Sequence, residues 1–423
     1  MAPPHRCVHR CPAAGGVRLL VLVLLLFGAA GAVAWWFVTR ARSPEARAVH
    51  YLRAELLARQ APGGTFGHMI HAAPDYWTTG EAAAALAACF EPADRERLRH
   101  QIAYCLQGAL AAPFPGTGLE APHGGWPLDL SADTIGGGEP SGWVGTAVGM
   151  AWLRLGAELH EAAARTRAFL LAIQNPDGSF SSVLIGPQAA RTSASQDCLL
   201  ALLVLESVPP VPSPEGAAAI ERAARWFGDT FDLEAGVWYP RVRRGWRQRH
   251  TVPGLSEMSA WLLLEARDVL ARAGRALAPS ATRALQQYAA RYEPDRREEL
   301  ATVLPADRQD YQFDLPPGAV TMWGKFGHRW SWYVYRALCS TRLAASTGLP
   351  RTAAWAGEAA WLREQLPRYL QALRDAPTFQ LAESLLMAAI LAYRPLGHPA
   401  RGSLVDLVRS EAARRGGLSG SMR

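Results

Sequence analysis

Two kinds of helical segment alternate along most of this chain. One kind is amphipathic, as in residues 46–60, where Val49, Leu52 and Leu56 fall on one face and charged residues on the others. The other kind is apolar on all sides, as in residues 81–90. An amphipathic helix is expected at the surface and an all-apolar helix in the interior. The pattern therefore predicts pairs of one outer and one inner helix.

The pairing recurs along the chain. Further outer helices are expected at 95–107, 159–174, 217–227, 281–292 and 354–373, and further inner ones at 143–155, 196–207, 257–270, 330–345 and 381–393. No segment has the sustained alternation of a β-strand. Six such hairpins most simply close into a ring with the apolar helices inside, although an open superhelix also fits. The predicted fold is an all-α (α/α)6 toroid over residues 39–395.

A short unit links outer to inner helices in at least two hairpins. Residues 174–180 read Gln-Asn-Pro-Asp-Gly-Ser-Phe, and residues 60–66 match them as Gln-x-Pro-x-Gly-x-Phe. The glutamine ends the outer helix, the Pro and Gly residues form the turn, and the phenylalanine folds back over the seam. Weaker copies occur at 124–126, 226–238 and 369–379.

This unit resembles the QW repeat of squalene-hopene cyclases and is similar to the repeats of protein prenyltransferase β subunits. The resemblance implies the toroid of the terpenoid cyclase and prenyltransferase superfamily, and an activity on a polyisoprenoid or lipid-linked substrate. The Asp-rich motifs of both cyclase classes are missing, because no two aspartates are adjacent in this chain. The zinc ligands of prenyltransferases are also poorly matched, since Asp197 and Cys198 are adjacent rather than spaced. We therefore predict neither a metal nor another cofactor.

The N-terminal region carries a separate signal. An apolar run over residues 18–38 ends in Trp35-Trp36-Phe37 and is long enough to cross a bilayer as a helix. It predicts a single-pass membrane protein with a short basic cytoplasmic tail at 1–17, the bilayer as a partner and the toroid outside the cytoplasm. A cleaved signal peptide ending near Ala34 is the alternative. At the other end, residues 396–423 are rich in Gly, Ser and Arg and predict a flexible basic tail.

Composition and charge limit the classes of partner that the protein is expected to bind. The chain has 423 residues, of which 49% are hydrophobic and 19% charged, so a large folded core is expected. Its net charge of +7 comes from arginines scattered along the helices, and Lys325 is its single lysine. Nucleic-acid binding is not predicted, because a nucleic-acid footprint would be clustered.

The candidate chemistry lies at the starts of the inner helices, which a toroid brings into one circle. These starts carry four acids and two indoles: Glu81, Trp143, Asp197, Glu257, Trp330 and Glu383. Asp197 is the expected acid, with Glu81, Glu257 and Glu383 as further catalytic carboxylates. Trp143 and Trp330 are expected to bind substrate together with Trp126 and His328, which lie in long loops at 111–142 and 298–329.

Each of these residues also has a structural interpretation. Acids are favoured in the first turn of any helix, and Thr78-Thr79-Gly80-Glu81 has the form of a capping box. The tryptophans can belong to the core. Three functions therefore stay open: a polyisoprenoid enzyme, a glycan-processing hydrolase, lyase or epimerase that uses the same acids, and a non-catalytic scaffold.

Overall fold

The computed structural model describes residues 43–68, 72–112, 120–127, 136–181, 190–239, 242–243, 246–247, 254–291, 328–373 and 376–420. It is mostly helical, with α2 (Pro44–Ala58), α3 (Tyr76–Ala88), α4 (Arg95–Gln107), α5 (Gly138–Leu155), α6 (His160–Ala172), α7 (Thr192–Leu205), α8 (Pro214–Thr230), α9 (Leu255–Arg272), α10 (Pro279–Ala290), α13 (His328–Ala345), α14 (Thr352–Ala372), α15 (Thr378–Tyr393) and α16 (Leu404–Gly420). The 3-10 turns η1 (Pro92–Asp94) and η2 (Gly156–Leu159) precede α4 and α6. The all-α prediction is confirmed.

Short antiparallel strand pairs lie in the segments between helices. Strand β1 (Trp126–Pro127) pairs antiparallel with β2 (Gly136–Gly137), with Trp126 opposite Gly137. Strand β3 (Val242–Arg243) pairs antiparallel with β4 (Trp246–Arg247).

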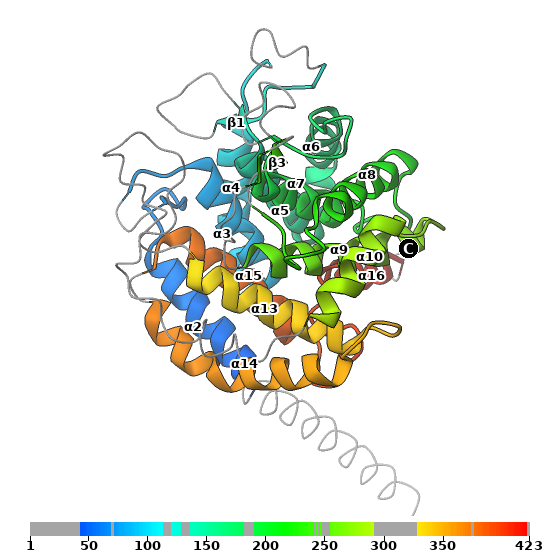
Figure 1. Ribbon diagram of the computed structural model, residues 1–423. Coiled ribbons are helices and arrows are strands. Elements are labelled where there is room, and N and C mark those ends of the chain that lie inside the picture. The colour runs from blue at the N-terminus through cyan, green and yellow to red at the C-terminus, as the bar shows by residue number, and fades with distance from the viewer. Residues whose placement is uncertain are drawn as a thin grey trace, which may run out of the picture.

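The helices form a closed double ring. The inner helices α3, α5, α7, α9, α13 and α15 each contact the next in this order, and α15 returns to contact α3. The outer helices α2, α4, α6, α8, α10 and α14 pack against them, and α2 lies beside α14 and α15, so the first outer helix closes against the last hairpin (Figure 1). This closure excludes the open superhelix within the described part of the chain.

The sequence pattern explains which helices are inside. In α7 every side chain from Ala194 to Leu205 is buried, as expected for a helix surrounded by others. In α2 burial is confined to one stripe that includes Ala48, Leu52 and Leu56, and Ser43 caps its start by accepting a hydrogen bond from the Ala46 amide at 3.0 Å. Each large apolar side chain buried in this way contributes about 1.5–3 kcal/mol.

Two glycines let the inner helices approach closely. A Cβ atom on Gly142 of α5 would lie 2.4 Å from the carbonyl carbon of Asp197 on α7. A Cβ atom on Gly80 of α3 would lie 3.2 Å from the amide nitrogen of Val144 on α5. Neighbouring inner helices therefore touch backbone to backbone near these two glycines.

The turn unit makes the same contacts in several hairpins. The glutamine that ends the outer helix donates to the carbonyl of the turn glycine, from Gln60 to Gly64 at 2.7 Å and from Gln174 to Gly178 at 3.2 Å. The aromatic residue that follows is buried, and its backbone amide donates to a hydroxyl in the first turn of the next inner helix. The pairs are Phe66 with Thr79, Trp126 with Ser141, Phe180 with Ser195 and Trp238 with Ser256. Hydroxyls in the first turns of the inner helices thus fix these aromatic plugs.

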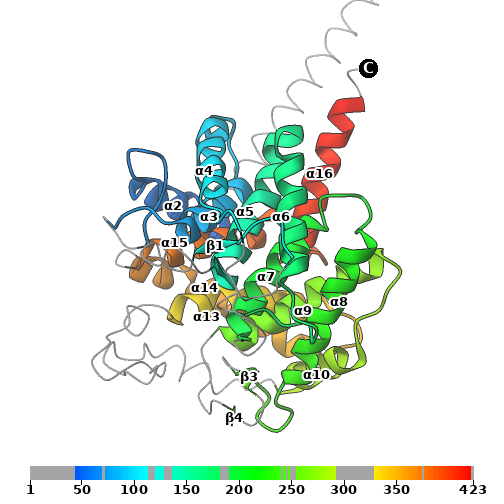
Figure 2. The same ribbon diagram turned by 90° about the horizontal axis from the view of Figure 1, so that it is seen from above.

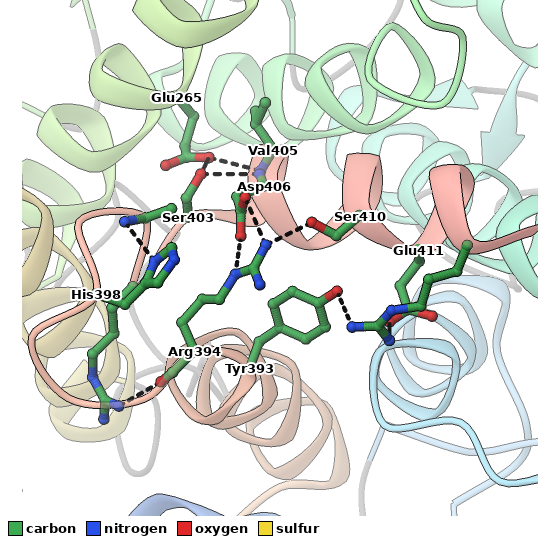
Figure 3. A network of polar contacts seen from close by, with 12 residues as sticks. Glu265, Tyr393, Arg394, His398, Ser403, Val405, Asp406, Ser410 and Glu411 are labelled. Carbon is green, nitrogen blue, oxygen red and sulfur yellow. Dashed lines mark hydrogen bonds and ion pairs between the residues drawn. The ribbon is translucent and has the colours of Figure 1, made fainter. Parts of the chain in front are cut away.

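The C-terminal region differs from the expected flexible tail. Helix α16 packs on α5, α7, α9 and α15, where Leu404, Leu407 and Val408 are buried (Figure 2). Glu265 of α9 accepts hydrogen bonds from the Ser403 hydroxyl at 2.9 Å and the Val405 amide at 2.8 Å (Figure 3). Residues 396–423 are rich in Gly, Ser and Arg, but they also contain a short apolar stripe. This stripe packs α16 against the ring.

The prediction of a single-pass membrane protein is corrected. Across the part of the chain that the structure describes, no helix combines the length and the apolar character needed to cross a membrane. The sequence stretch behind that prediction, residues 18–38, and the predicted tail at 1–17 lie outside the described residues.

Candidate functional site

Three predicted acids occupy the same position in their helices. Glu81, Asp197 and Glu383 are each the sixth residue of an inner helix, counting from Tyr76 in α3, Thr192 in α7 and Thr378 in α15. Trp143 is likewise the sixth residue of α5, which begins at Gly138. Because these helices run around one ring in the same direction, residues at equal depth lie at one level of its interior.

The three acids act on one another electrostatically. Glu81 is 2% exposed, and burial raises its pKa well above the usual value, with further increases from the charges of Glu383 and Asp197. One carboxylate oxygen, Oε1, accepts a hydrogen bond from the Trp77 indole at 2.7 Å. The other, Oε2, is buried without a hydrogen-bond partner. Glu81 therefore keeps its proton to higher pH than a surface glutamate and retains unused hydrogen-bonding capacity.

Asp197 has the fewest polar contacts of the three acids. It is 8% exposed, and burial raises its pKa well above the usual value, helped by the charges of Glu139 and Glu383. Neither a hydrogen-bond donor nor a cation pairs with its carboxylate within the described residues. A carboxyl group in this environment stays protonated to higher pH than a surface aspartate, and its proton is available for transfer.

Two further residues, which the sequence analysis did not assign to this site, interact with these acids. Glu139 of α5 receives a hydrogen bond from the Ser193 hydroxyl at 3.0 Å, while its Oε2 atom is buried and unpartnered. The Tyr335 hydroxyl of α13 donates to Oε1 of Glu383. Burial raises the pKa of Tyr335 well above its usual value, as do the charges of Glu383, Asp197 and Glu81. Five of the six inner helices thus contribute an acidic group to one region.

The sixth inner helix does not. Glu257 of α9 lies 3.5 Å from the guanidinium of Arg336, which also binds Glu358 at 3.1 Å and stacks over the Trp355 ring at 4.6 Å. Glu257 is the third residue of its helix, one turn closer to the end than the other acids. Glu257 therefore differs from the other three acids in that its charge is neutralised in an arginine network, and its grouping with them stays a prediction.

The capping interpretation of Glu81 is corrected. The N-cap of α3 is Asp75, whose carboxylate accepts a hydrogen bond from the Thr78 amide at 2.6 Å. Thr79, in the predicted capping box, instead binds Phe66. Glu81 lies beyond the first turn, where capping and the helix dipole have little effect.

The aromatic residues divide between core and undescribed positions. Trp126 has no exposed surface, and its indole donates to the Cys105 carbonyl at 2.6 Å, so its contacts are those of a core plug rather than the predicted substrate contact. Trp143 is 3% exposed. His328 and Trp330 begin α13, and their side chains lie outside the described residues, as does most of the 298–329 loop.

Nothing in the described ranges offers a metal site, since no three His, Cys, Asp or Glu residues are grouped so that they could hold an ion. The arrangement can instead donate protons and receive hydrogen bonds. A helical position shared across repeats, here the sixth, is the signal that would have united Glu81, Asp197 and Glu383 had the helix starts been placed correctly.

The fold is similar to that of several solved enzymes. The α-1,6-mannanase of a Salegentibacter species has a TM-score of 0.53 at 11% identity, over 81% of this chain and 98% of that one. The cellobiose 2-epimerase of Bacillus thermoamylovorans has a TM-score of 0.54 at 11% identity, over 81% and 98%. A sugar epimerase from a ruminal bacterium has 0.52 at 10%, over 76% and 87%. A type II terpene cyclase from Scytonema reaches only 0.46 at 16%, over 83% and 97%.

These comparisons concern shape alone. No protein-family model matches the sequence, and no curated protein matches it. At identities near 11%, the similarity to the mannanase and the epimerase establishes a common helical toroid. An activity has to be argued from the residues inside the ring.

Proposed function

We propose that the protein is a carbohydrate-processing enzyme, a hydrolase, lyase or epimerase, that uses the acids Asp197, Glu81 and Glu383. The observation that carries this proposal is the group of interacting carboxyls contributed by α3, α7 and α15, of which Glu81 and Asp197 are buried. Strongly shifted acids in one place are typical of catalytic sites, because both burial and like charge cost stability.

The acids have complementary chemical roles in this proposal. Asp197 stays protonated and donates to the oxygen of a glycosidic bond or a sugar carbonyl. Glu383, held in place by the Tyr335 hydroxyl, takes up a proton or orients water, and Glu81 shares the charge of the group. Because the carboxyls interact, they titrate as a unit rather than as independent groups.

The comparisons favour sugars over other substrates. The neighbours with the higher TM-scores are a mannanase and two sugar epimerases. An inactive form of the mannanase, in which two consecutive aspartates are replaced, has been solved with α-1,6-mannotriose. This chain has no two adjacent aspartates, so we expect its acids to act on a different sugar or by a different reaction.

A second candidate is an acid-initiated reaction of a polyisoprenoid. The observation that favours it is the repeated unit of glutamine, glycine and an aromatic residue, in which Gln60 and Gln174 make the same contact with the turn glycine; we propose that it is a QW-type repeat. A protonated, poorly solvated carboxyl such as Asp197 can also protonate a carbon–carbon double bond. The carboxyls of Glu139 and Glu383, which lie near Asp197, suit a sugar better.

One experiment separates these possibilities. The purified full-length protein is incubated with cellobiose, α-1,6-mannotriose or a geranylgeranyl substrate, and products are followed by chromatography and mass spectrometry. We expect turnover of a sugar that is lost in D197N and retained in E161Q, which changes an exposed acid on α6. Turnover of the prenyl substrate alone would establish the second candidate. Absence of binding and turnover across broad panels of both classes would contradict both and leave a scaffold.

A further inference from the structure

We infer that the acid site selects a sugar that carries a positive charge, an amino sugar with a protonated amine. This inference rests on the proposed function, because it names the substrate class of the same site. It comes from the way in which buried carboxylates are paired throughout the described part of the chain.

Most buried acids of the ring have an arginine partner. Such pairs join Glu45 to Arg401, Asp94 to Arg53, Glu206 to Arg167, Glu257 to Arg336, Glu265 to Arg342 and Glu358 to Arg336. This is the ordinary solution, since an isolated buried charge is costly unless it is paired. The chain is rich in arginine and uses it consistently for this purpose.

Three buried acids depart from the rule, and all three lie in the candidate site. Glu81, Glu139 and Asp197 are 2%, 5% and 8% exposed, and in the ranges that the structure describes no cationic side chain pairs with them. They lie near the beginnings of the neighbouring inner helices α3, α5 and α7. A deficit of positive charge that is confined to one site indicates that the missing charge is brought by a ligand.

Hydrogen bonding gives an independent indication. Oε2 of Glu81 and Oε2 of Glu139 are both buried and have no hydrogen-bond partner. A buried acceptor without a donor costs about 1–3 kcal/mol, and native proteins keep few of them. An ammonium group offers three donors and one positive charge, so it satisfies both the acceptors and the charge. A neutral hydroxyl supplies only the hydrogen bond.

The form of the cation follows from the surroundings. The described residues provide no three-ligand group for a metal ion, which favours an organic cation. The helix dipoles do not replace it, because their effect is confined to the first turn and Glu81 and Asp197 are sixth residues. Trp143 shares that depth on α5, and an indole is the preferred aromatic partner of an ammonium group.

The binding equilibrium must then involve protons. Burial raises the pKa of both Glu81 and Asp197, so these acids keep their protons to higher pH than surface carboxyls do. A bound cation stabilises their ionised forms and lowers their pKa, so that binding releases protons to the buffer. A ligand held only by neutral hydrogen bonds would release few or none.

Isothermal titration calorimetry of the full-length protein tests this with three probes: glucosamine hydrochloride, N-acetylglucosamine and glucose. Titrations run in two buffers of different ionisation enthalpy measure the proton count. We expect glucosamine to bind about tenfold more tightly than the neutral N-acetylglucosamine, a difference of about 1.4 kcal/mol, with net proton release. Ethanolamine serves as a cation without a sugar ring and should bind much more weakly.

Variants assign the effect to the site. E139Q and D197N should each lose the preference for glucosamine, and D197N should also release fewer protons, whereas E161Q should keep both the preference and the proton release. Equal affinity for the charged and neutral sugars, or a glucosamine preference that survives in E139Q and D197N, would overturn the inference while leaving a sugar enzyme intact. Ethanolamine binding as tightly as glucosamine would overturn the assignment of a sugar. If no sugar of any charge binds, the proposed function itself fails.

Discussion

Helix α16 depends on one buried carboxylate, and replacing Glu265 with alanine should release it. Glu265 is fully buried on α9, and its Oε1 atom lies 3.0 Å from the guanidinium of Arg342. Its Oε2 atom receives hydrogen bonds from Ser403 and from the Val405 amide, both at the start of α16 (Figure 3). Ser403 in turn caps the helix by accepting a hydrogen bond from the Asp406 amide at 3.1 Å.

The size of the effect follows from these contacts. Removing one partner of a buried ion pair costs about 3–5 kcal/mol, because the other charge stays buried. Asp268 also contacts Arg342 and offsets part of that cost. The unpaired Val405 amide and the loosened cap add about 1 kcal/mol each. We therefore expect E265A to lower the free energy of unfolding by about 3–5 kcal/mol.

Urea unfolding at 25 °C, followed by circular dichroism, measures this loss. Limited proteolysis should show faster cleavage within residues 396–420 of the variant. The matched control is E96A, which removes an 80% exposed acid from its pair with Arg99 and should change stability by less than about 1 kcal/mol. A loss below about 1.5 kcal/mol in E265A, or unchanged proteolysis, would show that α16 is not held by Glu265.

Three further predictions concern the site and the repeats. Burial raises the pKa of Asp197 in the folded state above its pKa in the unfolded chain. The contribution of Asp197 to stability is therefore complete below the pKa of the unfolded chain and is lost as the pH rises through the pKa of the folded state. D197N should therefore gain stability relative to the wild type at pH 8 compared with pH 4, in paired urea titrations; an identical difference at both would contradict the raised pKa. Y335F removes the hydroxyl bound to Glu383 and should cost about 1 kcal/mol of stability and shift the pH profile of turnover, and an unchanged profile would remove Tyr335 from the site. Q174A loses hydrogen bonds to Gly178 and Ala219 and from Arg222, and should cost about 1–3 kcal/mol in thermal or chemical unfolding, against little change for the exposed Gln287→Ala.

The sequence predicted the alternation of helices well and their starting points poorly. Helix α3 was expected from residue 81 and begins at Tyr76, α7 was expected from 196 and begins at Thr192, and α15 from 381 and begins at Thr378. In α3 and α7 the polar first turn explains the error. Thr79 and Ser195 bind the amides of the aromatic plugs, a tertiary contact that leaves no apolar signature in the sequence.

Those misplaced starts also account for what was missed in the site. Acids that seemed to begin helices are sixth residues, so the capping explanation of Glu81 had no basis in the fold. The pairing of Glu257 with Arg336 joins residues 79 positions apart and needed the closed ring to become visible. The hydrogen bond from Tyr335 to Glu383 likewise joins α13 to α15.

Buried carboxylates of the inner ring fall into two groups: Glu257 and Glu265 are paired with arginine, whereas Glu81 and Asp197 are not paired with a cation within the described residues. Toward the C-terminal ends of the inner helices, Glu265 is neutralised by Arg342 and Arg154 of α5 binds Glu411 of α16, so charge is used there to dock a helix. Nearer the N-terminal ends, Glu81 and Asp197 lack such partners in the described part of the chain and destabilise the fold when ionised. Substitutions in the two groups should therefore have opposite effects. E265A should weaken the fold without changing turnover by the folded fraction, whereas D197N should strengthen the fold near neutral pH and abolish turnover. If E265A and D197N changed the free energy of unfolding in the same direction, the proposal that Asp197 belongs to a functional site that destabilises the fold would be contradicted.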